Sequence, residues 1–327
     1  MCWITGKLAL SAPTEINPDF DTLSRFAIKL AKLVLRAFPA QPGPDYRPFD
    51  QITLEMGVRL ARAAYEDERD SGCGLLNYFE GKFKISGHLI LDLGCGFGGR
   101  TLAFQEQLGG TCIGADIDPR ASIAGSQLAE SMGTRACLFA TAVAEFLPFA
   151  DDSFDLVLCY DVMEHVQDLT KTLAEIYRVL KPKGVLLTVF PPYFHPQGSH
   201  LEGYVSRTPY AHLFFPSRIL LQAIDELITE RGDGYRPQPL RPGDRLYSLN
   251  GTTIRSFRHI LESSNFEILR LEFLPLLNRM IRKYDRLKMG YYSWIFSPLS
   301  RVPVLQELFT HRIVAILRKP APAAALK

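Results

Sequence analysis

A glycine-rich turn in the first third of the chain has the residue types of a nucleotide-binding loop. The segment Leu89-Ile-Leu-Asp-Leu-Gly-Cys-Gly-Phe-Gly-Gly-Arg100 places apolar residues and an acid directly before the glycines. Gly94, Gly96 and Gly98 permit backbone conformations that a Cβ forbids, and they let a ligand lie against the main chain at an electropositive helix start. We therefore predict a buried parallel strand, a ligand-binding turn and a helix beginning near Arg100.

Asp92, at the end of this predicted strand, distinguishes between two ligands of the loop. Gly94, Gly96 and Gly99 also satisfy the G-x-G-x-x-G fingerprint of dinucleotide-binding proteins. A carboxylate close to the ligand repels a diphosphate and attracts a cation. S-adenosylmethionine carries a sulfonium and an ammonium group but no phosphate, so Asp92 favours it over a nicotinamide dinucleotide.

A second acid, Asp116, ends the next predicted strand, which spans residues 111–116 and follows the first glycine of the loop by 22 residues. At this spacing a carboxylate accepts hydrogen bonds from both hydroxyls of a ribose. We include Ile117 with Asp116 in the predicted cofactor site. Asp118 is predicted instead to be the N-cap of a helix that starts at Pro119.

Three further motifs follow in order before residue 191. They are Asp151-Asp-Ser-Phe-Asp-Leu-Val-Leu-Cys-Tyr160, Asp161-Val-Met-Glu-His165 and Glu175-Ile-Tyr-Arg-Val-Leu-Lys-Pro-Lys-Gly184, and the strand Val185–Phe190 comes next. Together with the D-x-G-C-G-x-G loop, they resemble the class I, Rossmann-like methyltransferases, in particular the methyltransferase type 11-like group. The resemblance implies S-adenosylmethionine as cofactor and methyl transfer as activity. We expect the Asp161–His165 segment to start a helix.

The resemblance extends to the segment Ala142-Val-Ala-Glu-Phe-Leu-Pro-Phe149, which corresponds to the family's G-D-A-E-x-L-P-F segment beside the adenine ring. Val143 stands where the family has its aspartate. We therefore expect backbone atoms of Ala144 and Glu145 to contact the ring. The complete predicted cofactor-binding set is Asp92, Gly94, Cys95, Gly96, Gly98, Asp116, Ile117, Ala144, Glu145, Cys159 and Tyr160.

Three cysteine and tyrosine positions in this set have specific expected roles. Cys159 and Tyr160, at the end of the fourth predicted strand, are expected to hold the methionine end of the cofactor through backbone groups. Cys95 could act as a nucleophile, but we expect a small side chain that fills the turn, because cysteines are usually buried.

The alternation of strands and helices from residue 89 to 190 predicts an α/β fold with right-handed crossovers. The expected architecture is a doubly wound, mostly parallel seven-stranded sheet with an antiparallel C-terminal hairpin. Its last two strands are expected at residues 266–274 and 309–318, and the ligand is expected at the carboxyl ends of the parallel strands.

The chain divides into two predicted parts, an N-terminal helical cap at residues 1–84 and a methyltransferase domain at residues 85–327. Two insertions, residues 192–251 and 275–308, follow the fifth and sixth strands. Insertions at these places rise over the active-site end of the sheet, so we expect them to select the substrate.

Histidines cluster near the predicted strand ends and are the candidate catalytic residues. His165, His195 and His200 could act as a general base that removes a proton from an acceptor hydroxyl. The alternative is that they are loop histidines bonded to the backbone. His195, His200, Glu202 and His212 lack the fixed spacing of a metal site, so we predict no metal.

Two segments combine basic and apolar residues. Helical periodicity over residues 20–38 predicts an amphipathic helix that lies on an anionic membrane surface or a lipid-linked substrate, or else packs on the domain with a solvated basic face. Residues 278–294 interleave cations with aromatic side chains. They would suit a phosphorylated lipid-linked acceptor, a membrane face or single-stranded nucleic acid, or form a charged helix with a packed aromatic end.

The composition of the 327 residues sets limits on partners and location. Hydrophobic residues make up 47% and the formal net charge is +2, which argues against a general nucleic-acid-binding role. The six cysteines show no C-x-x-C spacing and indicate reduced thiols in the cytoplasm. Peripheral membrane contact remains open, and the oligomeric state is not specified.

We conclude from the sequence that the protein O-methylates a small-molecule or lipid-linked acceptor such as a saccharide or secondary metabolite. The alternatives are C-methylation, a non-catalytic methyltransferase-like binding protein that the Val143 substitution would favour, and, last, an NAD-dependent dehydrogenase.

Overall fold

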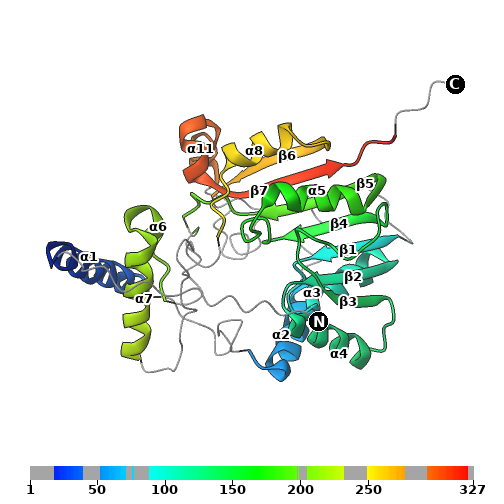
Figure 1. Cartoon of the computed structure of the whole chain (residues 1–327), viewed down its shortest axis with the longest axis horizontal. Coiled ribbons are helices and arrows are strands. Elements are labelled where there is room, and N and C mark those ends of the chain that lie inside the picture. Colours follow the sequence, from blue (N-terminus) through cyan, green and yellow to red (C-terminus); the bar gives the residue numbers. More distant parts are fainter. Residues whose placement is uncertain are drawn as a thin grey trace, which may run out of the picture.

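The structure, a computed structural model, describes residues 18–39, 52–70, 76, 88–196, 198, 205–231, 249–276 and 293–322. Its strands are β1 (Leu89–Leu93), β2 (Thr111–Asp116), β3 (Cys137–Thr141), β4 (Phe154–Tyr160), β5 (Leu180–Phe190), β6 (Glu267–Pro275) and β7 (Thr310–Arg318). They form one sheet in the order β3-β2-β1-β4-β5-β7-β6 (Figure 1). The strands β1 to β5 are parallel and β7 is antiparallel to both of its neighbours, which confirms the predicted fold class.

The direction of β7 brings a late part of the chain to the predicted ligand edge. The carboxyl ends of the parallel strands lie together, as parallel pairing requires. Because β7 runs the opposite way, Phe190 at the end of β5 pairs with Ile313 near the start of β7.

Helices cover both faces of this sheet. The described helices are α1 (Pro18–Ala37), α2 (Leu54–Asp70), α3 (Gly99–Leu108), α4 (Pro119–Ser131), α5 (Leu169–Val179), α6 (Ala211–Phe214), α7 (Ser217–Arg231), α8 (Ile254–Glu262), α10 (Ser293–Phe296) and α11 (Pro303–Phe309), with a short 3-10 turn, η6 (Leu299–Arg301). Successive strand residues face opposite sides. Leu91 and Leu186 therefore pack with α5 and α8, whereas Ile90 and Leu187 pack with α2, α3 and α4.

The segment after β4 corrects one expectation. Asp161–His165 forms a turn rather than a helix, and α5 begins only at Leu169. Asp161 adopts a left-handed backbone conformation with φ of 56°, which does not continue into a right-handed helix. The helix starts where Asp168 can cap it, since this carboxylate accepts a hydrogen bond from the N–H of Lys171.

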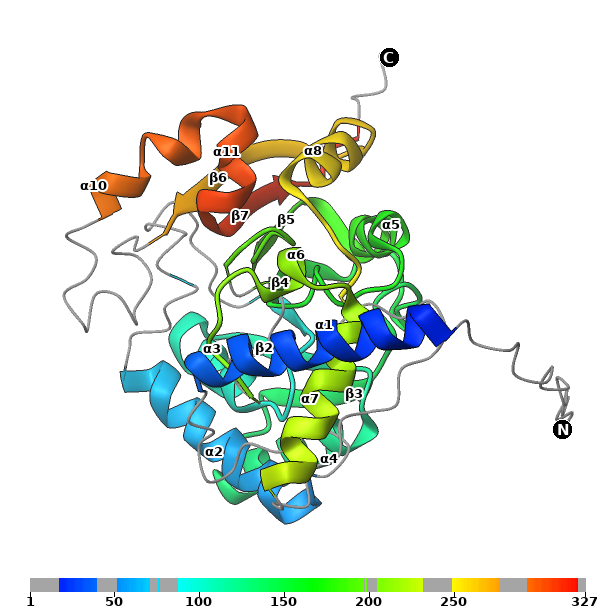
Figure 2. The same cartoon turned by 90° about the vertical axis from the view of Figure 1, so that its left-hand side faces the viewer.

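A third apolar cluster lies apart from both faces of the sheet. It contains Ile28, Ala31, Leu35, Val205, Ala211, Leu220, Ala223, Ile224, Leu227 and Ile228, and so joins α1 to α6 and α7. Figure 1 shows α1 and α7 beyond the sheet edge toward which the parallel strands run, and in Figure 2 α1 crosses in front of α7. Within the described residues, no helix is long and apolar enough to span a bilayer.

The two N-terminal helices therefore have different partners. While α1 packs on α7, α2 packs against the sheet domain, where the Tyr65 hydroxyl donates to Glu106 of α3 at 2.7 Å. Arg120 of α4 also donates to the carbonyl of Ile52, just before α2, at 3.0 Å. The predicted boundary at residue 84 stays a prediction.

Candidate functional site

The glycine loop forms a tight turn with one open side. Gly94 has φ of 72°, and its N–H donates to the carbonyl of Ala115 at 2.7 Å. A Cβ at Gly94 would collide with the side chain of Val162, so this glycine lets the turn after β4 lie directly against the loop. A Cβ at Gly96, by contrast, would enter open space, which leaves room there for a ligand.

Asp116 borders this open side, and its carboxylate is held in one orientation. One oxygen accepts the N–H of Gly96 at 2.9 Å and the other accepts the N–H of Asp118 at 3.0 Å. Each oxygen keeps a second lone pair for a ligand hydroxyl. Burial raises the pKa of Asp116 and the backbone N–H groups oppose this rise. Ile117 beside it is 67% exposed and offers an apolar surface.

Asp118 next to these residues caps α4, as the sequence predicts. It occupies the N-cap position before Pro119, and its carboxylate accepts the N–H of Arg120 at 2.8 Å. This bond satisfies one of the free donors at the start of the helix.

Asp92 lies beneath the loop rather than on its open side. It is buried, and its carboxylate accepts a hydrogen bond from the hydroxyl of Thr101 in α3 at 2.6 Å. Burial raises the pKa of Asp92 to about 6, although the Thr101 bond opposes the rise. Its ionised form supplies negative charge close under the site, which suits a cationic ligand.

Cys95 and Cys159 are both buried free thiols. Burial raises the pKa of each thiol well above its ordinary value. Because the thiolate is the reactive form, neither residue has the surroundings of a nucleophile.

Tyr160 closes the end of β4 between two arginines. The guanidinium of Arg100 lies 4.5 Å from its ring centre and that of Arg312 lies 5.6 Å away. Arg100 donates to Glu68 of α2 at 2.9 Å, and Arg312 forms an ion pair with Asp161. The contacts around Tyr160 therefore join α2 and the start of α3 to the end of β4 and to β7.

The segment expected beside the adenine ring is fixed to the start of α5. Glu145 accepts the N–H groups of Gln167 at 2.7 Å and Asp168 at 3.1 Å, so its side chain holds the turn. Val143 is exposed and Ala144 is half-buried. Contact of this backbone with a cofactor stays a prediction.

The candidate catalytic histidines occupy different surroundings. His195 is buried and its Nε2 shares a hydrogen bond with Nδ1 of His311, on β7. His212 donates from Nε2 to the carbonyl of Tyr193 at 2.7 Å, and burial lowers its pKa. His165 lies in the turn after β4, with its side chain 36% exposed and its Nε2 3.9 Å from Oε1 of Glu164. His200 lies outside the described residues.

Glu164 is the site residue that the sequence analysis did not single out. It is 4% exposed, and neither carboxylate oxygen has a hydrogen-bond partner in the described part of the chain. Burial and the nearby charge of Asp161 raise the pKa of Glu164 well above its ordinary value, and Arg312 opposes this. The available signal in the sequence was the acid beside His165 in the Val162–Val166 turn.

A small cavity lies beside Glu164. It is lined by Glu164, Pro191, Pro192, Tyr193, Gly198, Leu249, Gly251 and Thr252. The end of the first insertion closes it, because Asn250 donates from its side chain to the carbonyls of Met163 at 2.7 Å and Val166 at 2.9 Å. The turn that carries Glu164 also contacts Gly94 through Val162, so it links the wall of this cavity to the glycine loop.

Residues 91–188 match the family model described as a methyltransferase domain. This segment of the chain is therefore similar to methyltransferase domains. Residues 89–190 supply the parallel strands, the glycine loop and Asp116 described above.

Over the aligned residues, curated relatives are about one third identical to this chain. The uncharacterized methyltransferase YcgJ of Bacillus subtilis is 35% identical over 119 residues, which are 36% of this chain and 46% of YcgJ. The ubiquinone/menaquinone biosynthesis C-methyltransferase UbiE of Marinomonas sp. is 34% identical over 154 residues, 46% of this chain and 57% of UbiE. This chain thus spans about half the length of these relatives. The crystal structure of B. subtilis YcgJ aligns with a TM-score of 0.45 and 19% identity, covering 76% of this chain and 99% of YcgJ.

S-adenosylmethionine is the cofactor that the sequence predicts, and the residues present fit it. The open space over Gly96 gives it room, the oriented Asp116 carboxylate suits ribose hydroxyls, and Ile117 suits an apolar ring face. The buried negative charge of Asp92 suits a sulfonium more than a diphosphate.

Proposed function

We propose that the protein methylates an oxygen of a small-molecule or lipid-linked acceptor, with Glu164 as the proton acceptor. The observation that carries this proposal is the buried carboxyl group of Glu164, which lines a small cavity and has no hydrogen-bond partner among the described residues, the His165 ring lying 3.9 Å away. Buried polar groups are nearly always hydrogen-bonded, so one without a partner calls for a ligand group or a water.

The raised pKa of Glu164 supports this role. An exposed carboxylate is a weak base near neutral pH, and burial strengthens it by disfavouring the charged form. The cavity has room for about one water-sized group, so only the hydroxyl of the acceptor would enter it. That hydroxyl would donate its hydrogen bond to Glu164 and give up its proton there as the oxygen forms its new bond to carbon. The cofactor, when bound, supplies the methyl group.

The remaining residues position these groups and keep water away. Pro191, Pro192 and Leu249 give the cavity an apolar wall, while Asn250 fixes the turn on which Glu164 stands. Such alignment contributes to an in-line displacement by holding the reactants in contact. His195 and His165 remain further proposed bases at this edge, and His200 lies outside the described residues.

A C-methyltransferase is the second candidate, favoured by the similarity to a protein named UbiE C-methyltransferase. Transfer to carbon also needs a base, so Glu164 would serve either reaction, and the product identifies the acceptor atom. We place the reaction in a reducing compartment, because the four described cysteines are free thiols.

Two variants test the proposal by separating cofactor binding from turnover. We expect Asp116→Ala to weaken binding of S-adenosylmethionine by about 1–3 kcal/mol in titration calorimetry, because hydrogen bonds to a charged group are lost. We expect Glu164→Gln to bind the cofactor like the wild type but to transfer labelled methyl groups about a hundredfold more slowly to acceptors in a cell extract. NAD, titrated separately, should not bind.

Glu262→Gln, an exposed change on α8, is the matched control and should leave both measurements unchanged. If Glu164→Gln turned over like the wild type, Glu164 would not be the proton acceptor, and a histidine would take that role. Absence of S-adenosylmethionine binding to the wild type would instead favour a non-catalytic protein.

A further inference from the structure

The helix α1 has two apolar faces, and α7 covers only one of them. Ile28 and Leu35 are buried in the cluster shared with α7. On the other side, Leu23, Phe26 and Leu33 are 70%, 67% and 66% exposed, and Leu30 between them is also exposed. A helix that only packs on its own domain normally turns a polar face outward. This exposed stripe therefore indicates a second contact surface.

Basic side chains form one edge of the stripe. Arg25 and Lys29 are four residues apart, so they lie along one line of the helix, next to the line that carries Phe26 and Leu33. Both basic side chains are exposed. The exposed half of α1 thus combines large apolar side chains with a basic border.

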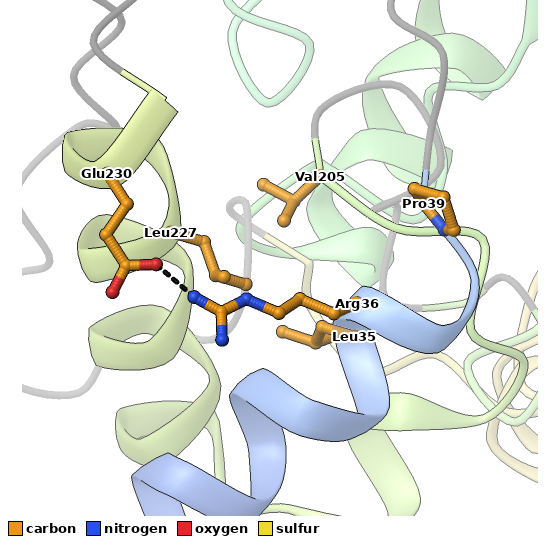
Figure 3. Close-up of a pocket in the computed structure, with 6 residues that line it drawn as sticks. All are labelled: Leu35, Arg36, Pro39, Val205, Leu227 and Glu230. Atoms are coloured by element: carbon orange, nitrogen blue, oxygen red, sulfur yellow. Dashed lines mark hydrogen bonds and ion pairs between the residues drawn. The ribbon is translucent and has the colours of Figure 1, made fainter.

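The inner side of α1 is fixed by ion pairs, which sets the direction of the stripe. Lys32 donates to Glu226 at 2.7 Å and to Glu230 at 2.6 Å, both on α7. Figure 3 shows the far end of this contact, where Arg36 reaches across a cleft to Glu230 beside Leu35 and Leu227. The stripe accordingly points away from α7, and Figure 2 shows α1 as the outer of the two helices.

We propose that the outer face of α1 docks on an anionic lipid surface. Helices that lie in a membrane interface bury Leu and Phe below the headgroups and place Lys and Arg against anionic lipids, and the stripe with its basic border has this composition. A symmetric contact with a second copy is less complementary, because two-fold symmetry would bring each basic border to an identical surface.

The place of α1 in the fold gives this docking a consequence. Because α1 and α7 lie beyond the carboxyl ends of the parallel strands, docking would turn the cofactor edge of the sheet toward the lipid (Figure 1). Docking on a lipid surface favours a lipid-linked acceptor over a small soluble one. This inference about the acceptor rests on the proposed methyltransferase function.

The test measures binding to vesicles directly, without any methyl transfer. The full-length protein should float with vesicles of phosphatidylcholine and phosphatidylglycerol and should not float with phosphatidylcholine alone. The double change Phe26→Ser with Leu33→Ser should weaken this binding about tenfold or more, since two large apolar side chains lose their burial. Lys29→Glu should weaken it too, and added salt should do the same in the wild type.

Ile268→Ser, which changes an exposed apolar residue on β6, is the matched control and should bind vesicles like the wild type. Equal binding by the double variant, or no binding by the wild type, would overturn the proposal. A concentration-dependent dimer that the double variant abolishes would assign the stripe to a second copy instead. Cofactor binding, titrated in the same samples, does not depend on vesicle binding. A negative vesicle result would therefore not contradict the proposed methyltransferase function.

Discussion

At the scale of single residues, the candidate site contains two buried acids, Asp92 and Glu164, whose burial disfavours their charged forms. The carboxylate of Asp92 is buried and accepts the hydroxyl of Thr101, while the carboxylate of Glu164 accepts no hydrogen bond from the described residues. Burial of a carboxylate disfavours its charged form, so both groups hold their protons to higher pH than an exposed acid does.

This leads to a prediction for Asp92. Its pKa rises from 3.8 to about 6 on folding, so between these values the folded chain binds more protons than the unfolded chain. The contribution of Asp92 to the free energy of unfolding therefore falls as the pH rises through this window. Asp92→Asn removes this pH dependence, so the free energy of unfolding of the variant, relative to that of the wild type, should rise by about 2 kcal/mol from pH 4 to pH 7.

Urea unfolding followed by circular dichroism at several pH values measures this difference. Loss of the hydrogen bond to Thr101 would change the free energy of unfolding of the variant by the same amount at every pH. Asp225→Asn, an exposed change on α7, should show no such trend. A difference between Asp92→Asn and the wild type that stays constant with pH would contradict the burial argument.

At the scale of elements, the turn at residues 161–168 is held by groups that come from far along the chain. It touches the glycine loop at Gly94, and the carbonyl of Glu164 accepts the N–H of Asn250 at 2.8 Å. The Asn250 side chain also accepts the N–H of Thr252 at 2.9 Å. Residues 249–252, at the end of the first insertion, therefore hold the turn that carries Glu164 in place; we call this contact the clip.

We expect Asn250→Ala to destabilise this clip by about 1–3 kcal/mol, because the buried carbonyls of Met163 and Val166 lose their donors. Amide hydrogen exchange should accelerate in residues 163–166 and 249–252 and change little in the strands. Asn265→Ala, at an exposed position between α8 and β6, is the control. Unchanged exchange in the turn would show that other contacts hold it.

At the scale of the whole molecule, the hydrophobic core has two separate parts, one around the sheet and one between α1 and α7. The sheet has clusters on both faces, and the α1–α7 cluster contains no strand residue among its buried members. Such units open with their own free energies when few contacts join them. We expect the α1–α7 pair to open more readily than the sheet.

Leu35→Ala tests this separation. The fully buried side chain leaves a cavity, so the pair should lose about 2–5 kcal/mol of stability, and exchange should accelerate in α1 and α7 together while β1 to β5 keep their protection. Leu33→Ala makes the same chemical change on the exposed side of α1 and should have little effect. Equal loss of protection in the strands would mean that the molecule unfolds as one unit.

Short-range patterns in the sequence determined the central fold. The β2 boundaries, the glycine turn and the Asp118 cap agree with prediction, because apolar runs, glycines and caps act over a few residues. The order of strand and helix then leaves few topologies for a parallel sheet, so the carboxyl edge and Asp116 could be placed in advance.

Only the tertiary structure decided which side chains lack partners. The antiparallel direction of β7 brings His311 to His195, which lies far from it in the sequence. The burial of Glu164 depends on the returning insertion, and the exposed stripe on α1 depends on which face α7 covers. The hydrophobic periodicity of a sequence shows which face of a helix or strand is apolar. Whether a side chain on that face is buried depends on contacts with distant segments, which no local pattern contains.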